Sequence, residues 1–154
     1  MLKTQDEIIR IVRDGQSKGE TFVVTNGCFD ILHVGHVRYL QETKKFADKL
    51  IVMLNSDKSV KAIKGESRPI NCEEDRAEIL SSLSCVDYVV LFDENSPARL
   101  LGEIRPNVYT KGADYTLESL PERDVVLENN IRVEFINFVD GKSTTNVINK
   151  INRN

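Results

Sequence analysis

The chain has 154 residues, of which 40% are hydrophobic and 29% are charged, a composition that fits one folded domain over residues 1–154 and excludes a disordered or fibrous chain. The 21 Lys and Arg residues against 24 Asp and Glu leave a net charge of −3, so no broad positive field attracts nucleic acid or an anionic membrane, and we expect neither partner. Any phosphorylated ligand must therefore be held by local groups.

The cysteines and the N-terminal segment indicate the compartment. Cys28, Cys72 and Cys85 are too far apart in sequence for a CxxC pair, and three cysteines fit no closed disulfide framework. The first 15 residues carry charges throughout and lack the apolar core of a signal peptide, and no apolar run approaches the ~18 residues that span a bilayer. We therefore expect a cytoplasmic protein.

The first half of the chain alternates helical and strand patterns. Thr4 and Glu7 have the spacing of a capping box at the start of a helix that ends in the polar stretch 14–19. The β-branched run 21–25 predicts a buried strand, residues 35–47 carry a helical apolar stripe, and the wholly apolar run 50–54 predicts a second strand.

The alternation continues to the C-terminus. We expect a polar, ligand-covering loop over 55–71, helices from Glu73, over 97–104 and from Ser143, and strands over 86–92, 107–110 and 131–136. Apolar strands separated by helices predict a parallel sheet of about five strands, covered on both faces. The predicted fold class is therefore α/β, doubly wound and Rossmann-like.

The segment GCFDILHVGH, residues 27–36, lies where the first buried strand ends and a helix begins. Ligands of open α/β sheets bind beyond the carboxyl ends of the strands, and a helix start offers free N–H groups to an anion. His33 and His36, the only two histidines, flank Gly35 and are placed to donate hydrogen bonds to one phosphate chain. The alternatives are structural histidines or metal ligands, but zinc would need further Cys or His nearby, and no Walker P-loop is present.

The same segment resembles the HxGH signature of the cytidylyltransferase-like superfamily of nucleotidyltransferases. KGESRPI, KGADY and DGKSTT follow it in the order and spacing of the heptose 1-phosphate adenylyltransferases, which make ADP-heptose for bacterial lipopolysaccharide, and the resemblance spans about residues 20–152. It implies an enzyme that joins ATP and D-glycero-D-manno-heptose 1-phosphate and releases pyrophosphate. It also implies Mg2+ accompanying the ATP, a homodimer, and a separate sugar kinase that supplies the acceptor.

The resemblance assigns roles where residues match. The catalytic residues are His33, His36 and Lys64; the nucleotide is bound by Gly27, Cys28, Phe29, Gly35, Lys111, Gly112, Asp114, Gly141, Ser143, Thr144 and Thr145; the acceptor is bound by Asn26, Asp30, Lys61 and Arg68, and no metal ligand is expected. Simpler alternatives exist for some of them, because a lysine can be a solvated surface charge, Ser143 only a helix N-cap, and Asp114 a turn residue.

Three other functions stay open at this point. The glycerol 3-phosphate cytidylyltransferases of the same superfamily have an arginine where this chain has Phe138, which weakens a CTP-dependent reading. A nucleotide-binding regulator without turnover is a second alternative, disfavoured because both histidines are present. A purely structural module is the third. A matrix of nucleotides and sugar phosphates, assayed for pyrophosphate, separates base choice, acceptor choice and lack of activity, and a structural module would show no ATP-dependent thermal shift.

Overall fold

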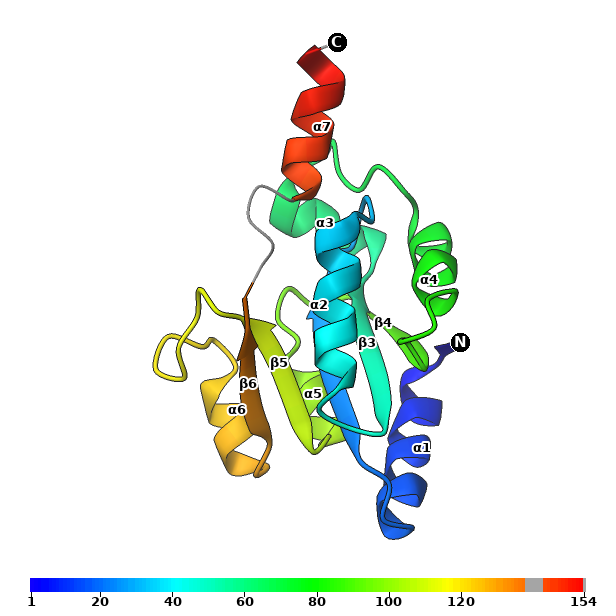
Figure 1. Ribbon diagram of the computed structural model, residues 1–154, viewed down its shortest axis with the longest axis vertical. Coiled ribbons are helices and arrows are strands. Elements are labelled where there is room, and N and C mark those ends of the chain that lie inside the picture. Colours follow the sequence, from blue (N-terminus) through cyan, green and yellow to red (C-terminus); the bar gives the residue numbers. More distant parts are fainter. Residues whose placement is uncertain (138–142, 154) are drawn as a thin grey trace.

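The computed structural model, which describes residues 1–137 and 143–153, contains a six-stranded parallel sheet with helices on both faces (Figure 1). The spatial order of the strands is β1-β4-β3-β2-β5-β6, and every pairing is parallel. The strands are β1 (Leu2–Lys3), β2 (Phe22–Gly27), β3 (Lys49–Asn55), β4 (Tyr88–Phe92), β5 (Val108–Gly112) and β6 (Arg132–Ile136). The helices are α1 (Gln5–Ser17), α2 (Val34–Lys44), α3 (Asp57–Lys64), α4 (Glu73–Ser81), α5 (Ala98–Ile104), α6 (Arg123–Glu128) and α7 (Thr144–Arg153).

The central strand β3 shows how the sequence builds two cores. Successive side chains of a strand point to opposite faces, so its continuous apolar run serves both layers. Leu50, Val52 and Leu54 join one cluster with residues of α2 and α4. Ile51 and Met53 join the other, with residues of α1, α5 and α6. All five side chains are fully buried, which confirms the doubly wound α/β class.

Buried hydroxyl groups fasten α2 to the sheet. The Tyr39 hydroxyl of α2 lies 3.0 Å from the Thr25 hydroxyl of β2 and 3.2 Å from the Thr110 hydroxyl of β5. Thr43, one turn further along α2, lies 3.2 Å from the same Thr110 hydroxyl. Because buried polar groups are costly unless hydrogen-bonded, this network fixes α2 over one place on β2 and β5.

Several predicted helix starts are confirmed. The Glu7 N–H donates to the Thr4 hydroxyl at 3.2 Å and the Thr4 N–H donates back to Glu7, which completes the capping box of α1. Helix α4 begins at Glu73, and α7 begins directly after Ser143, as the sequence predicts.

Three expectations were wrong in detail. The sheet has six strands instead of five, because β1 contributes only two residues beside β4, too few to leave a periodic pattern. The expected loop over 55–71 contains α3, whose start is capped by the Ser56 side chain and whose buried residues are only Ser59 and Val60. Helix α6 was missed because one turn and a half of helix carries too little periodicity.

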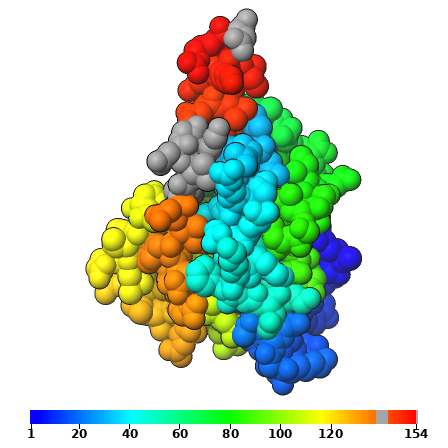
Figure 2. Space-filling model, viewed as in Figure 1, coloured from blue at the N-terminus to red at the C-terminus, as the bar shows by residue number. Residues whose placement is uncertain are grey.

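The last helix differs from the others in its surroundings. Helix α7 projects beyond the carboxyl edge of the sheet in Figure 1 and stands out from the body in Figure 2, and none of its side chains is buried. No helix in residues 1–137 and 143–153 combines the length and the apolar character needed to cross a membrane.

Candidate active site

The two histidines form the start of α2. His33 is the N-cap residue, and its Nδ1 accepts a hydrogen bond of 3.1 Å from the Gly35 N–H. The His33 N–H in turn donates to Nδ1 of His36 at 3.3 Å. The two imidazole rings stack with their centroids 3.9 Å apart. The histidines therefore build a reciprocal capping box, a role that serine, threonine and glutamate more commonly fill.

These hydrogen bonds determine which ring nitrogen carries the proton. A neutral imidazole has one N–H and one acceptor nitrogen, so a ring that accepts at Nδ1 carries its proton on Nε2. Burial, followed by the neighbouring His33, lowers the pKa of His36 to about 4. His36 is consequently neutral near pH 7 and carries an Nε2–H donor.

Phe29 and Gly27 shape the loop that leads into this helix. Phe29 has a positive φ of 45°, which few side chains adopt, and its ring packs edge-on against His36 at a centroid distance of 5.1 Å. A Cβ atom at Gly27 would lie 2.8 Å from that ring, so only glycine lets Phe29 approach β2 so closely. Gly35 is buried at the second position of the helix.

Asp30 and Arg68, both predicted to bind the acceptor, are paired with each other. Arg68 Nε donates to the Asp30 carboxylate at 2.6 Å, and the N–H groups of Ile70 and Asn71 donate to it at 2.8 Å and 3.0 Å. Burial alone would raise the pKa of Asp30, but the two amides and the guanidinium outweigh it and hold the pKa below 3.8. Asp30 thus joins the β2–α2 loop to residues 68–71.

The predicted lysines lie on α3. Lys61 and Lys64 occupy its last turn and are exposed. Burial raises the pKa of the Cys28 thiol, while the Lys64 ammonium is the first of three cations that oppose the rise. Lys64 is therefore close enough to the end of β2 to affect the electrostatics there, although it belongs to a different element.

The end of β5 contributes the next group of predicted residues. The Tyr109 hydroxyl donates to Asn26 Oδ1 at 2.5 Å, which joins the carboxyl end of β2 to β5. Lys111 lies over the Tyr115 ring, with its ammonium 5.2 Å from the ring centroid. Gly112 is buried, whereas Asp114 is exposed. Parallel strands bring these residues and the histidines to one edge of the sheet.

The start of α7 reaches the same edge. The Ser143 hydroxyl accepts from the Asn146 N–H at 3.0 Å, so Ser143 is an N-cap, and the Thr144 hydroxyl donates to the Ile31 carbonyl at 3.2 Å. Thr145 is exposed. Thr144 thus joins the start of α7 to the loop that carries His33. Gly141, also predicted to bind nucleotide, lies outside the described residues.

The sequence reasoning missed Arg76, a fully buried guanidinium of α4 next to the predicted site. Its Nη1 donates to the Cys28 carbonyl at 2.7 Å. One sequence signal points to it: Arg76 precedes Leu80 by four residues and thus shares the apolar side of α4, where a charge needs buried partners.

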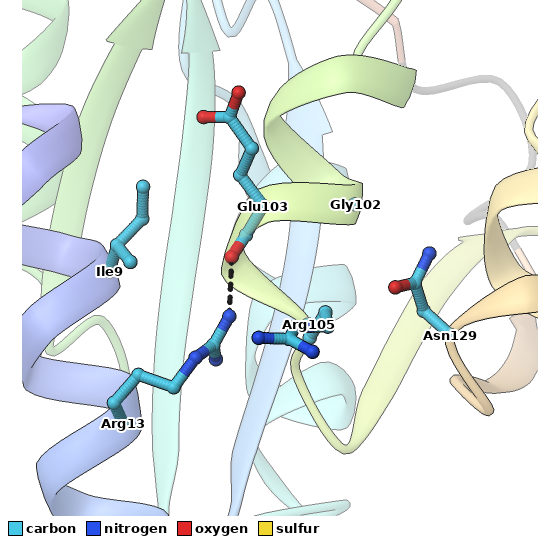
Figure 3. A pocket seen from close by; sticks show the side chains of 6 residues that line it. All are labelled: Ile9, Arg13, Gly102, Glu103, Arg105 and Asn129. Carbon is cyan, nitrogen blue, oxygen red and sulfur yellow. Dashed lines mark hydrogen bonds between the residues drawn. The ribbon is translucent and has the colours of Figure 1, made fainter.

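A cavity elsewhere in the molecule contains none of the predicted site residues. It lies between α1, α5 and α6 (Figure 3), and Arg13 there donates to the carbonyl groups of Ile104 and Glu103 at the end of α5. These bonds satisfy the carboxyl end of a helix, which is a structural use of an arginine. Its lining residues are Ile9, Arg13, Gly102, Glu103, Arg105 and Asn129.

Comparison with known proteins identifies the family. Residues 24–150 match the model of the family described as "Cytidylyltransferase-like". The chain is 51% identical over 152 residues to the "Bifunctional protein HldE" of Geobacter metallireducens, and 52% identical over 146 residues to that of Campylobacter fetus. These alignments cover 99% and 95% of this chain but only 31% and 30% of the relatives, so the chain spans about a third of their length.

One solved structure is matched over its whole length. The crystal structure of "the lipopolysaccharide core biosynthesis protein" from Thermoplasma volcanium is 31% identical, with a TM-score of 0.66, and the match covers 79% of this chain and 100% of that one. The family match starts in β2, includes both histidines and ends within α7. The chain therefore belongs to the cytidylyltransferase-like family of nucleotidyltransferases.

Proposed function

We propose that the chain transfers the AMP group of ATP to the phosphate of a sugar 1-phosphate, giving an ADP-sugar and pyrophosphate. The acceptor is D-glycero-D-manno-heptose 1-phosphate and the product is ADP-heptose. The observation that carries this proposal is the histidine capping box, in which the Nδ1 atoms of His33 and His36 are occupied by backbone N–H groups at the start of α2. A neutral imidazole that accepts at Nδ1 carries its proton on Nε2, so the two rings can donate to a phosphate chain.

The triphosphate lies between two helix starts. The amino ends of α2 and α7 each present free N–H groups and partial positive charge, and the Thr144–Ile31 hydrogen bond holds them together. The nucleotide-binding residues are Gly27, Cys28, Phe29, Gly35, Lys111, Gly112, Asp114, Gly141, Ser143, Thr144 and Thr145. Asn26, Asp30, Lys61 and Arg68 line the acceptor side, where Asp30 acts by holding Arg68 in place.

The reaction is a direct displacement at the α-phosphorus. An oxygen of the sugar phosphate forms the new P–O bond, and the bond from the α-phosphorus to the bridging oxygen of the β-phosphate breaks, so pyrophosphate leaves with the electron pair. A phosphate dianion is already a nucleophile, so no general base or covalent enzyme intermediate is needed. The histidines stabilise charge that develops on phosphate oxygens. The flexible side chain of Lys64 keeps its ammonium group in contact with the phosphates during the transfer.

In this proposal Mg2+ binds together with the nucleotide. Within residues 1–137 and 143–153, no group of three or more His, Cys, Asp or Glu side chains is arranged to hold a metal ion. Mg2+ is commonly held by substrate phosphates and water with one or two carboxylates, which fits a site without a cage of protein ligands. No step of the proposed reaction depends on a metal bound by the protein alone.

The identity of the acceptor is proposed from sequence similarity. The KGESRPI, KGADY and DGKSTT segments resemble the heptose adenylyltransferases, and the relatives named HldE are about half identical over nearly the whole of this chain. Because the acceptor is itself a phosphate ester, a sugar kinase must act before this step. We include the homodimer and a cytoplasmic location, where ATP is available, in the same proposal.

A pyrophosphate-release assay with ATP and CTP against heptose 1-phosphate and glycerol 3-phosphate tests the proposal. We expect release only with ATP and the heptose phosphate. Release with CTP and glycerol 3-phosphate instead would replace the proposal with a cytidylyltransferase. Tight ATP binding without release from any pair would indicate a nucleotide-binding regulator.

A further inference from the structure

Arg76 is the largest fully buried side chain among the described residues, with 1% of its surface exposed. Its guanidinium donates four hydrogen bonds between 2.7 and 2.9 Å. A buried cation is costly unless it is paired and its donors are satisfied. The acceptors come from four places in the chain: the carbonyl groups of Cys28, Asn55 and Asn71 and the carboxylate of Asp57.

Three of the four acceptors belong to segments that carry predicted site residues, and the fourth, Asn55, lies just before the lysine helix. Cys28 follows the end of β2 and begins the loop that leads to His33. Asn55 ends β3, and Asp57 is the first residue of α3, the helix that carries Lys61 and Lys64. Asn71 holds the Asp30 side chain that binds Arg68. One guanidinium thus contacts the histidine loop, the lysine helix and the segment of Arg68.

A second bond from the same helix fixes α3. The Asp57 N–H donates to the Glu73 carboxylate at 2.9 Å, so α4 holds both the backbone and the side chain of the first residue of α3. The geometry of the histidines comes from the α2 cap, whereas the start of the lysine helix is held by its bonds to α4. The position of the lysines relative to the histidine loop therefore depends on α4.

We propose that Arg76 is a positioning residue that sets the lysine helix α3 against the histidine loop, so that both groups meet one phosphate chain. This inference deepens the proposed function and rests on it. Arg76 does not touch the substrates. The planar fork of arginine serves this purpose because two Nη atoms and Nε reach separate acceptors, whereas the single ammonium of lysine cannot span them.

The test separates positioning from support of the fold. In Arg76→Lys the charge stays while the fork is lost, and we expect kcat to fall about 10- to 100-fold, as for a small misplacement of reacting groups. The KM for ATP should change less than about threefold, because the histidine cap and both helix starts remain. Leu80→Ala, on the same helix and equally buried, is the matched control: it should lower thermal stability and leave kcat of the folded protein unchanged.

A double-mutant cycle with Lys64 shows whether Arg76 acts through α3. If it does, Arg76→Lys in a Lys64→Ala background costs much less than the same change in the parent protein, because the misplaced group is already gone. Equal losses in both backgrounds, or a kcat of folded Arg76→Lys within about twofold of the parent, would overturn the proposal. Asp57→Asn, which keeps Arg76 and weakens its contact to α3, serves if Arg76→Lys does not fold.

Amide hydrogen exchange keeps this inference separate from the proposed reaction. We expect Arg76→Lys to speed exchange in residues 28–36 and 57–64 together, whereas Leu80→Ala should leave the exchange rates of both segments unchanged. If the parent protein releases no pyrophosphate, the proposed reaction fails, while the exchange experiment still decides the role of Arg76. Unchanged exchange in both segments would refute the coupling.

Discussion

The two helix starts at the carboxyl edge of the sheet are held in different ways. The start of α2 is fixed by two reciprocal histidine bonds, by the Phe29 ring and by the hydroxyl groups that fasten Tyr39 to the sheet. The start of α7 is capped by Ser143 and contacts the body through Thr144, and no side chain of that helix is buried. The first start is held by many contacts, and the second depends on few.

Because of this difference, we expect the two helix starts to have different functions. Interactions that accelerate the reaction must be in place before the transition state, which favours a rigid element such as α2. An element with few buried contacts opens at low cost and suits substrate entry and product release. We therefore expect changes at α2 to act on turnover and changes at α7 to act on nucleotide affinity.

The largest effect is expected at the histidines. His36→Ala and His33→Ala should each lower kcat by about two to three decades, because each removes a donor to developing charge. His33→Asn keeps a side-chain acceptor at the N-cap, so it should lose the same turnover but retain about 1 kcal/mol of stability that His33→Ala loses. Steady-state kinetics and urea unfolding measure the two effects, and near-normal turnover in any of the three variants contradicts the assignment.

A smaller effect is expected at α7. Thr144→Val keeps the shape of the side chain but removes the bond to the Ile31 carbonyl, so the KM for ATP should rise about threefold to tenfold, the worth of one hydrogen bond. Its kcat should stay within about twofold of the parent. Lys150→Ala, on the same exposed helix but far from its start, is the control and should change neither constant. A fall in kcat with constant KM would show that α7 is part of the preformed site.

The smallest effect concerns stability and pH. The pKa of His36 is about 4 in the folded protein against an ordinary 6.5, so the unfolded chain binds the proton first as pH falls. The free energy of unfolding should therefore be highest above pH 6.5 and decline towards pH 4. His36→Gln should flatten that decline in urea unfolding series. An equal decline in the variant would show that other groups cause it.

Asp30 acts in a lower pH range. Its folded pKa is held below 3.8, so the stability that its contacts with Arg68 and Asn71 contribute is present above 3.8 and is lost as pH falls through the folded pKa. Asp30→Asn should remove this more acidic part of the stability profile while leaving the decline that starts near pH 6.5. Loss of both parts at once would mean that the two groups are coupled.

Much of the fold could be predicted because it depends on local patterns. The buried run 50–54 identifies a central parallel strand, and the Thr4 and Glu7 spacing identifies the start of α1. The histidines could be placed at a helix start because the change from strand to helix pattern lies directly before them. β1 and α3 were missed because two residues carry no period, and a helix with only Ser59 and Val60 buried has no clear apolar stripe.

The rest of the site depends on contacts between segments far apart in sequence. Nothing near Asp30 shows that it binds Arg68, 38 residues away, and nothing near Arg76 shows that its acceptors include Cys28, 48 residues earlier. A single sequence gives residue types and local periodicity, whereas these bonds follow from how β2, β3 and α4 are arranged together. The prediction thus located the histidines but not the groups that hold their surroundings.

The histidine cap also explains why the motif has its spacing. The residue before the first turn and the one three positions later are the pair whose side chains can each reach the other end's free amides. A shorter separation would turn one ring away around the helix axis. In the proposed reaction, replacing either imidazole by alanine therefore removes a phosphate donor and a helix cap together, and only a substitution that still caps the helix, such as His33→Asn, separates the two effects.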